Sequence, residues 1–484
     1  MKQFFTLIAC CTFGVAISQQ TPEKWDLRKM VDYAMKNNIS VQQTEVQARI
    51  TALQHQANKL AIYPTANFNT GIGMQFGRSV DPTTNQFTTT QLLFNNFNFS
   101  TGIVLYNWGR LKNNITSSDY ATKAAVADIE RAANDIALNV CTYYLAALSS
   151  KQQIEIAQKQ IESTTEQLIN TRKKVNAGAL PELNAAELES RLASDSINYF
   201  NAISNYDQNV LNLKALLNIG MATPFDIETP SLDKIPLEPL AELEPAAVLQ
   251  LSLTSMPQQK VAELRNKSAA YAVKSAKANM YPTITFGGGL GTNFANSTNK
   301  IKSVTLGAGV PTGDYVTVGG TNYLIYQPSL QITQGKKSFS EMWDGYGVQL
   351  NNNFRQNLGF QINIPIFNNG SAKLNYENSK LQLRQTEIAI EQSKQKLEQD
   401  IYLAYNNAIA ALQRFNASQK TVETAERTYD YAKKRYDVGL ITTLDLITNQ
   451  NNLLQAKLTR LNNHFDYVFR MKLLEFYKGQ GLKL

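Results

Sequence analysis

Two glycine-centred breaks, which lie 261 residues apart, constrain the fold of this 484-residue chain more than any other feature. The first break is centred on Gly178 and the second on Gly439, and each separates two long helical patterns. Leu183 and Leu444 repeat at the same spacing, as do the segments that flank both breaks. A fixed offset of this kind indicates an internal two-fold repeat. We therefore expect two copies of one unit, each turning sharply at a glycine with positive φ.

The helical patterns that precede the two breaks are very long. Residues 111–175 contain neither Gly nor Pro, and a matching helix is expected over 372–436. About 65 helical residues span on the order of 100 Å. Both patterns have a seven-residue period, at Ile154, Ile161, Leu168 and Val175 in the first and at Phe415, Val422, Tyr429 and Tyr436 in the second. This period is typical of a coiled coil.

Four shorter segments have a period of two and are expected to be strands, over about 64–76, 98–107, 283–295 and 356–367. Apolar side chains alternate in them with Gly, Ser, Thr, Asn or Gln, as Phe360 and Ile362 alternate with Gly359 and Gln361. The polar face is too small for a protein core but suits a water-filled lumen, and the apolar face suits lipid. The pattern therefore predicts strands of a transmembrane barrel.

Four strands do not suffice for such a barrel within one chain. A closed barrel needs at least about eight strands, and open sheet edges are not tolerated in lipid. The sequence therefore predicts an oligomer. The remaining helical part has small and polar residues at many seam positions, which suits a hollow helical cylinder with water on both sides. The expected fold class is an α+β membrane protein.

The order of these segments defines the expected organisation. Repeat 1 covers 19–245, with a helix over 19–62, a loop over 77–97, a tip at 176–184 and a proline-rich linker over 219–245. Repeat 2 covers 246–484, with a helix over 246–279, a long irregular insert over roughly 296–355 and a tip at 437–445. Residues 1–18 have the pattern of a secretory signal peptide. Cys10 also fits a lipoprotein signal, so lipidation is left open.

Composition argues against several other functions. The net charge is +8, but the basic residues are interspersed with acidic ones, so no nucleic-acid partner is expected. Two His and three Cys leave almost nothing for a metal site, and no cofactor is predicted. The glycines of 287–291 lack the Lys-Ser/Thr ending of a phosphate loop. No nucleophile–base arrangement is visible, so we expect no enzyme activity, and Cys141 is expected to be a small buried residue.

The chain resembles the TolC-type outer-membrane efflux proteins. The segments that carry the resemblance are Tyr63-Pro64-Thr65 and its echo Tyr281-Pro282-Thr283, the strand exit Pro365–Gly370, and the turn from Tyr436 to Ile447. The resemblance implies a homotrimer with a twelve-stranded barrel in the outer membrane and a helical tunnel in the periplasm. It also implies docking on a periplasmic adaptor and an inner-membrane pump. The function implied is a passive conduit for efflux or type I secretion.

The resemblance further assigns roles to both tips. Adaptor contacts are implied for Gly178, Ala179, Leu180, Leu183, Gly439, Leu440, Ile441 and Leu444. A periplasmic gate is implied for Asp445, Thr448, Tyr436 and Asn184. In the family, a tyrosine at the position of Tyr436 ties one hairpin to the other through an acidic partner, which is Asn184 here. A second carboxylate of the family gate is replaced by Thr448. A three-fold ring of Asp445 would favour cations and raise the pKa of the carboxyl.

Simpler roles compete with these assignments. Tyr429 and Tyr436 have the spacing of packing residues, and Asp445 suits the N-cap of the last helix. For the whole chain, the alternatives are a passive porin-like channel, a cell-surface coiled-coil structural protein, and a soluble periplasmic enzyme or binding protein. A porin would not need helices of about 100 Å, and a structural coiled coil would not need strands with a lumen-type face.

Overall fold

The structure is a computed structural model that describes residues 24–80, 87–88, 91–229 and 235–479. The predicted signal peptide 1–18, with Cys10, lies outside the described residues. The chain forms two compact units. The helical unit comprises Met1–Gln54, Ser118–Ala269 and Gln382–Leu484, and the sheet unit comprises His55–Ser117 and Ala270–Leu381. Each unit is described separately below.

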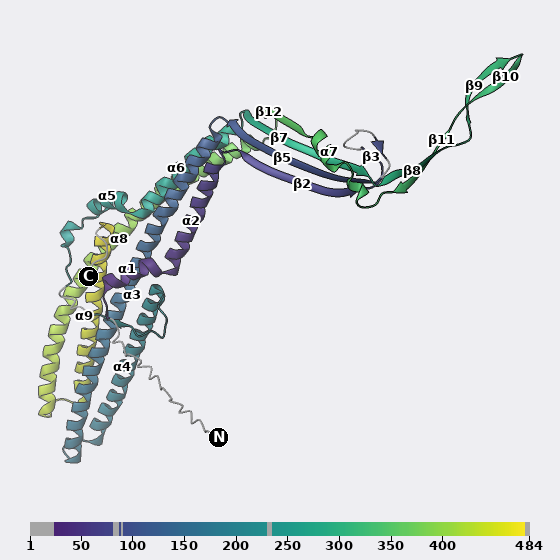
Figure 1. The fold of residues 1–484 in the computed structure, drawn as a ribbon. Coiled ribbons are helices and arrows are strands. Elements are labelled where there is room, and N and C mark those ends of the chain that lie inside the picture. The colour runs from purple at the N-terminus through teal and green to yellow at the C-terminus, as the bar shows by residue number, and fades with distance from the viewer. Residues whose placement is uncertain (1–23, 81–86, 89–90, 230–234, 480–484) are drawn as a thin grey trace, which may run out of the picture. The chain divides into compact units, whose positions relative to one another are not determined.

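The helices are α1 (Leu27–Asn37), α2 (Ile39–Leu60), α3 (Arg110–Asn176), α4 (Glu182–Leu217), α5 (Pro245–Ser255), α6 (Pro257–Ala278), α7 (Tyr346–Asn352), α8 (Ser371–Asp437) and α9 (Thr443–Tyr477). Helices α3 and α8 each contain 67 residues and begin 261 residues apart (Figure 1). Helices α1 and α5 each contain 11 residues, and α2 and α6 each contain 22, with both pairs separated by 218 residues. The offset therefore grows within the strand region. In the part of the chain that the structure describes, no helix has an apolar run long enough to cross a membrane.

The two shorter helical predictions require correction, because each helix is interrupted. The expected helix over 19–62 breaks at Asn38, whose backbone is extended. The Asn38 amide donates to the Leu216 carbonyl oxygen at 2.8 Å, and its side-chain oxygen accepts from Ser40 N–H at 2.8 Å. The expected helix over 246–279 breaks at Met256, since a residue before proline avoids helical geometry. The linker also contains a short strand, β6 (Asp226–Ile227), which pairs in parallel with β1 (Lys24–Trp25).

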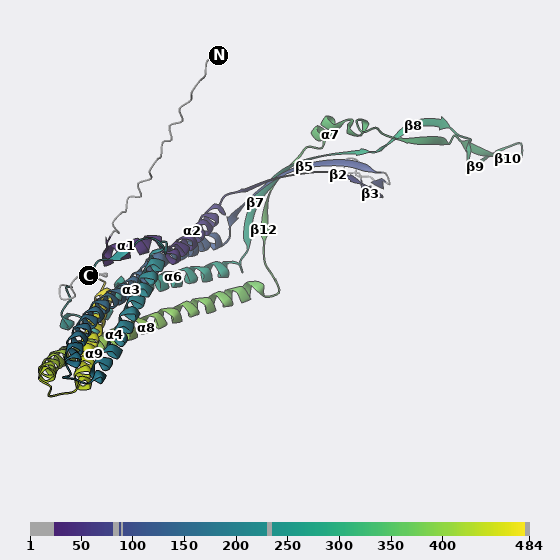
Figure 2. The same ribbon diagram turned by 90° about the horizontal axis from the view of Figure 1, so that it is seen from below.

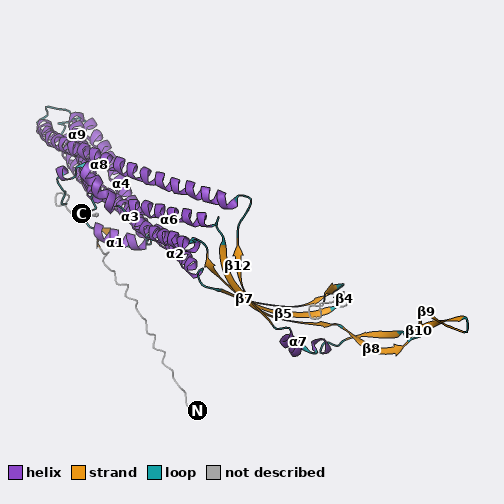
Figure 3. Cartoon of the chain, turned by 90° about the horizontal axis from the view of Figure 1, so that it is seen from above, coloured by secondary structure: helices purple, strands orange, loops and turns teal. Residues whose placement is uncertain are grey.

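The sheet unit contains a four-stranded antiparallel sheet in the order β12-β7-β5-β2 (Figure 3). Its strands are β2 (Thr65–Gln75), β5 (Leu92–Tyr106), β7 (Thr283–Ser297) and β12 (Arg355–Asn363). Strand β5 therefore begins inside the predicted loop 77–97, where β3 (Ser79–Val80) also pairs with β4 (Phe87–Thr88). Strand β12 ends before Pro365, which lacks the N–H needed to continue the ladder. Strands β2 and β12 are the two edges of this sheet.

The register places the apolar side chains on one face of the sheet. Phe99 lies opposite Phe68 on one side and Leu290 on the other, and Phe286 lies opposite Phe360. Directly opposed residues share a face. The alternate positions form the other face, and they include Asn67, Ser100, Gly287, Gly289, Asn357 and Gln361. One face is thus suited to lipid and the other to water.

The predicted irregular insert over 296–355 is wrong, because most of it has regular structure. Four strands form a two-stranded ribbon: β8 (Asn299–Leu306), β9 (Val310–Val318), β10 (Thr321–Gln327) and β11 (Leu330–Lys336). Strand β8 pairs with β11 and β9 with β10, so that the ribbon continues from β7 (Figure 1). Its turn consists of Gly319 and Gly320, both with positive φ, as a tight hairpin turn requires. The short 3-10 helix η3 (Glu341–Trp343) and α7 then lead into β12.

The helical unit has two main apolar clusters. In the first, Met30 and Ala34 of α1 pack with Tyr144 of α3 and Leu213 of α4. The first cluster also contains Cys141, which is buried as predicted. The second joins residues of α5, α8 and α9, which are Val248, Leu397, Ile401, Met471 and Leu474. Both clusters hold the long helices side by side.

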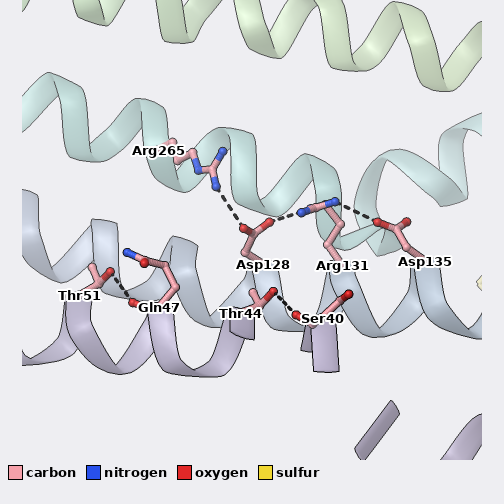
Figure 4. A network of polar contacts seen from close by, with 8 residues as sticks. All are labelled: Ser40, Thr44, Gln47, Thr51, Asp128, Arg131, Asp135 and Arg265. Atoms are coloured by element: carbon pink, nitrogen blue, oxygen red, sulfur yellow. Dashed lines mark hydrogen bonds and ion pairs between the residues drawn. The ribbon is translucent and has the colours of Figure 1, made fainter. Parts of the chain in front are cut away.

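Charged contacts add to the packing between α3 and α6. The Arg131 guanidinium bridges Asp128 at 2.7 Å and Asp135 at 2.9 Å, and Arg265 reaches Asp128 at 3.3 Å (Figure 4). Nearby, the hydroxyls of Thr44 and Thr51 donate to backbone carbonyls one turn earlier within α2. The Arg265–Asp128 pair connects two helices that are far apart in sequence.

Candidate functional site at the helix tips

Both helix breaks have the same local geometry. Gly178 has φ of 73° and Gly439 has φ of 77°, which confirms the left-handed conformation predicted for them. The N–H of Ala179 donates to the Lys174 carbonyl oxygen and that of Leu440 to the Arg435 carbonyl oxygen, both at 2.8 Å. Such bonds close the end of a helix. No atom lies near the position that a Cβ would take at either glycine, so backbone conformation and not space selects glycine.

The residues that follow the two glycines form exposed tips. Leu183, Leu440 and Leu444 have exposed side chains, while Leu180 and Ile441 are half-buried. The Arg172 guanidinium pairs with Glu182 and Glu189 of α4, which fixes the first hairpin near its tip. Exposed leucines on an ordered turn are suited to contact with another protein.

Asp445 belongs to a capping box at the start of α9. The N-cap of this helix is Thr442 and not Asp445, which corrects one of the roles considered for the aspartate. The Asp445 carboxylate accepts from the Thr442 hydroxyl at 2.7 Å and from its N–H at 3.1 Å, and Thr442 accepts from Asp445 N–H at 3.1 Å. The hydroxyl and N–H of Thr442 hold the pKa of Asp445 below its ordinary value. In a single chain, this effect is opposite to the rise in pKa expected from a three-fold ring.

The depressed pKa predicts how stability depends on pH. A carboxyl group with a lowered folded-state pKa stabilises the protein above its unfolded-state pKa, here 3.8, and this contribution is lost as pH falls through the folded-state value. Asp445→Asn is therefore expected to lower the thermal unfolding midpoint at neutral pH, and the difference should shrink below pH 3.8. Calorimetric scans of both proteins across this range test the prediction. A variant that is more stable than wild type at neutral pH would show that repulsion between neighbouring Asp445 side chains dominates.

Tyr436 is buried and connects the two hairpins. Its hydroxyl lies 3.0 Å from the Thr171 hydroxyl of α3 and 3.3 Å from the Thr443 hydroxyl of α9. The partner on the first hairpin is thus Thr171, while half-buried Asn184 lies on α4, where its N–H donates to the Pro181 carbonyl oxygen. The Lys174 ammonium adds a contact to the Asp437 carbonyl oxygen at 3.4 Å. The bonds of the Tyr436 hydroxyl are neutral, as the family comparison implied.

Further polar contacts join the hairpins above Tyr436, and we call them the polar ladder. The Gln167 amide donates to the Tyr429 hydroxyl at 2.7 Å, and the Gln450 amide donates to the Thr164 hydroxyl at 3.3 Å. The Thr164 hydroxyl in turn donates at 2.7 Å to Asp195 of α4. The sequence analysis missed Thr164 and Thr171, although they recur at seven-residue spacing beside the apolar seam. That spacing is a signal that could have found them.

The other predicted gate residue, Thr448, is exposed on α9. Its hydroxyl donates to the Leu444 carbonyl oxygen at 2.8 Å, within the same helix. Asp445 and Thr448 therefore lie on the exposed side of α9, whereas Tyr436 and Thr443 are buried between the hairpins. Among the described residues, no group of His, Cys, Asp or Glu side chains could hold a metal ion.

A sheet with one apolar and one polar face, joined to long helical hairpins with capped tips, defines a channel-forming protein of the outer membrane. The sequence profile of the outer membrane efflux protein family matches residues 30–219 and 325–468, which is more than half of the chain. The chain therefore belongs to this family. It is an outer-membrane efflux channel protein with a periplasmic extension, and it is not an enzyme.

Solved structures share the fold. Crystal structures of CusC match with a TM-score of 0.71 at 17% identity, covering 95% of each chain. The outer membrane channel CmeC of Campylobacter jejuni matches with a TM-score of 0.69 at 18% identity, covering 94% of this chain and 86% of that chain. The outer membrane protein VceC of Vibrio cholerae matches with a TM-score of 0.71 at 13% identity, covering 94% and 97%. No curated protein sequence matches the chain.

Proposed function

We propose that three copies of this chain form one conduit, with a closed twelve-stranded barrel in the outer membrane and a helical tunnel in the periplasm. The observation that carries the proposal is the four-stranded sheet, which has an apolar face, a polar face and two edges, β2 and β12, available for pairing. Lipid does not tolerate open edges. Pairing β12 of one chain with β2 of the next removes all edges, and three chains reach a strand number that closes around a lumen.

The equal helix lengths support an internal two-fold repeat within this conduit. Helices α3 and α8 match in length, as do α1 and α5, and α2 and α6. Repeat 1 would cover 19–245 and repeat 2 would cover 246–484. Each chain would then contribute two similar hairpins to the tunnel wall, which gives six similar hairpins per trimer.

The tips of these hairpins are the proposed contacts with a periplasmic adaptor, which would link the conduit to an inner-membrane pump. The proposed contact residues are Gly178, Ala179, Leu180, Leu183, Gly439, Leu440, Ile441 and Leu444. The exposure of Leu183, Leu440 and Leu444 supports this role, because isolated leucines at a helix tip bury no core of their own chain. Efflux substrates and proteins secreted by type I systems would both use such a passive path.

The oligomer is tested with the purified full-length chain in detergent and in planar bilayers. We expect light scattering to give a mass of three chains after correction for detergent, and the bilayers to show small, discrete, cation-selective openings. A chain that stays monodisperse and monomeric without detergent, and that opens no channel, would contradict both the barrel and the conduit.

We further propose that the tip of the second hairpin closes the channel, with Asp445, Thr448, Tyr436 and Asn184 as its gate residues. Tyr436 is buried and holds the second hairpin against the first through Thr171. Opening of the tip would require the second hairpin to move away from α3 and would break this bond. Asp445 and Thr448, on the exposed side of α9, are free to line the opening.

Tyr436→Phe is expected to increase the open fraction of the channel. The variant loses the hydroxyl contacts with Thr171 and Thr443, and each hydrogen bond contributes about 1 kcal/mol. A change of this size shifts an equilibrium roughly tenfold. Single-channel recording measures the open fraction directly. Tyr431→Phe is the matched control, because Tyr431 lies on the same helix with an exposed ring. Equal open fractions in both variants would remove Tyr436 from the gate.

A further inference from the structure

The segment 338–354, which we call the rim segment, folds back onto the apolar face of the sheet. It contains η3 and α7, and Figure 2 shows α7 beside the strands of the sheet unit. Its Trp343 ring stacks on Phe294 of β7 with centroids 5.6 Å apart and planes 5° apart, and its Tyr346 ring contacts Phe294 edge-on at 4.9 Å. Phe294 is completely buried as a result. Phe294 shares its face of β7 with Phe286 and Leu290, so the rim segment lies on the apolar side.

Hydrogen bonds fix the rim segment to the two central strands. The Tyr346 hydroxyl donates at 2.7 Å to Asn95 of β5, which lies opposite Phe294. The Asn296 amide of β7 donates to the Met342 carbonyl oxygen at 3.1 Å, and the Thr292 hydroxyl donates to the Leu350 carbonyl oxygen at 2.6 Å. Because β5 and β7 are central strands, these contacts leave the edges β2 and β12 free to pair with other chains.

The position of Phe294 along β7 places the rim segment at one boundary of the bilayer. Ten residues separate Phe294 from Ile284, near the end of the strand that follows α6. At about 3.4 Å per residue this distance is about 34 Å along the strand, or about 26 Å along the membrane normal for a tilt of about 40°. The apolar band of an outer-membrane barrel is about 25 Å tall. The polar side chains Asn95 and Asn296 begin at this same level, where the apolar face ends.

The outer surface of the rim segment has the composition of a membrane interface. Phe339 is 74% exposed, Val348 is 65% exposed and Phe354 is 50% exposed, although the segment already buries Phe294 beneath it. Asp344 and Arg355 are exposed in or beside the same segment. Trp and Tyr rings collect at the interface because one side is apolar and the other polar. Exposed apolar side chains next to charged ones suit the boundary between headgroups and acyl chains.

We propose that the rim segment is a second lipid-binding element, which lies in the interfacial layer of the outer leaflet on the outside of the barrel. It continues the lipid-facing surface of the sheet, with Phe339, Trp343 and Val348 inserted among the upper acyl chains. This inference rests on the proposed barrel. The rim segment would fix the height of the channel in the membrane, because its charged residues resist deeper insertion and its apolar residues resist withdrawal.

The test uses tryptophan quenching by brominated phosphatidylcholine in vesicles. The chain has three tryptophans, so Trp25→Phe with Trp108→Phe leaves Trp343 as the reporter. We expect roughly twofold quenching of Trp343, stronger with bromine near the headgroup end of the acyl chain than near its terminus, as suits an interfacial ring. Val348→Trp, in a chain whose three native tryptophans are Phe, should behave in the same way. Its exposed side chain can be replaced without disturbing packing.

Phe360→Trp in the same tryptophan-free chain separates this inference from the barrel. Phe360 lies on the apolar face of β12, opposite Phe286. Quenching of Phe360→Trp without quenching of Trp343 and Val348→Trp would overturn the lipid role of the rim segment and leave the barrel intact. Absence of quenching in all three proteins would overturn the barrel and the inference with it. A chain that retains only Trp25, in the helical unit, should remain unquenched throughout.

Discussion

Asp195→Leu is expected to lower the free energy of unfolding of the helical unit by about 3–5 kcal/mol. Asp195 is completely buried on α4 and pairs with the Arg191 guanidinium at 2.9 Å. It also accepts the Thr164 hydroxyl at 2.7 Å and the Gln160 amide at 3.4 Å. Removing the carboxylate leaves the charge of Arg191 buried without a partner, because the Arg191 side chain is only 10% exposed. The uncompensated charge, and not the lost contact alone, makes the effect large.

Denaturant titration in detergent, followed by the helical circular dichroism signal, measures this change. Asp207→Leu is the matched control, since Asp207 lies on the same helix with an exposed side chain. The double variant Asp195→Leu/Arg191→Leu should recover most of the lost stability, because two apolar side chains can replace a buried ion pair. A single variant as stable as the control would show that water reaches Arg191 and that the pair is not buried in the assembled protein.

Phe360→Arg is expected to reduce the stability of the inserted sheet by about 2–4 kcal/mol per chain, the penalty for an arginine near the bilayer midplane. Phe360 points to the apolar face, whereas its neighbour Gln361 points to the polar face. Gln361→Arg is therefore the matched control, with the same new side chain one residue away. In the trimer the loss is repeated three times, so assembly should fail in the first variant and persist in the second.

The fraction of protein folded into phosphatidylcholine vesicles, measured across a urea titration, tests this prediction. The order of the two variants carries the result, because both add one positive charge to the same strand. Equal stability of Phe360→Arg and Gln361→Arg would mean that the two faces meet the same environment. A reversed order would place the polar face toward lipid.

The sequence predicts the regular elements well where one physical rule dominates. The absence of Gly and Pro over 111–175 predicts α3 to within a residue at each end. Alternation in the segment around Phe360 predicts β12, because its two faces meet different environments. Positive φ at Gly178 and Gly439 follows from the helix ends alone. These features depend on local sequence or on a single periodic contrast.

The missed features depend on contacts between distant residues. The break at Asn38 depends on the Leu216 carbonyl oxygen, far away in the sequence. The ribbon β8–β11 was mistaken for an irregular insert because both of its faces are exposed, so its apolar residues show no consistent alternation. The partner of Tyr436 depends on how α3 and α8 are rotated against each other, which sequence spacing does not fix. The capping box was readable from Thr442 and Asp445, three residues apart.

The ribbon accounts for the growth of the spacing between equivalent helices from 218 to 261 residues, since the added length lies between β7 and β12. Both ends of that connection return to the same sheet, and the helices that follow keep their register. The turn at Gly319 and Gly320 thus lies at the end of the sheet opposite the strand termini that join the helices. A foreign epitope spliced between these two glycines would be carried outside the cell once per chain. The protein therefore offers a natural splice point for surface display of peptides.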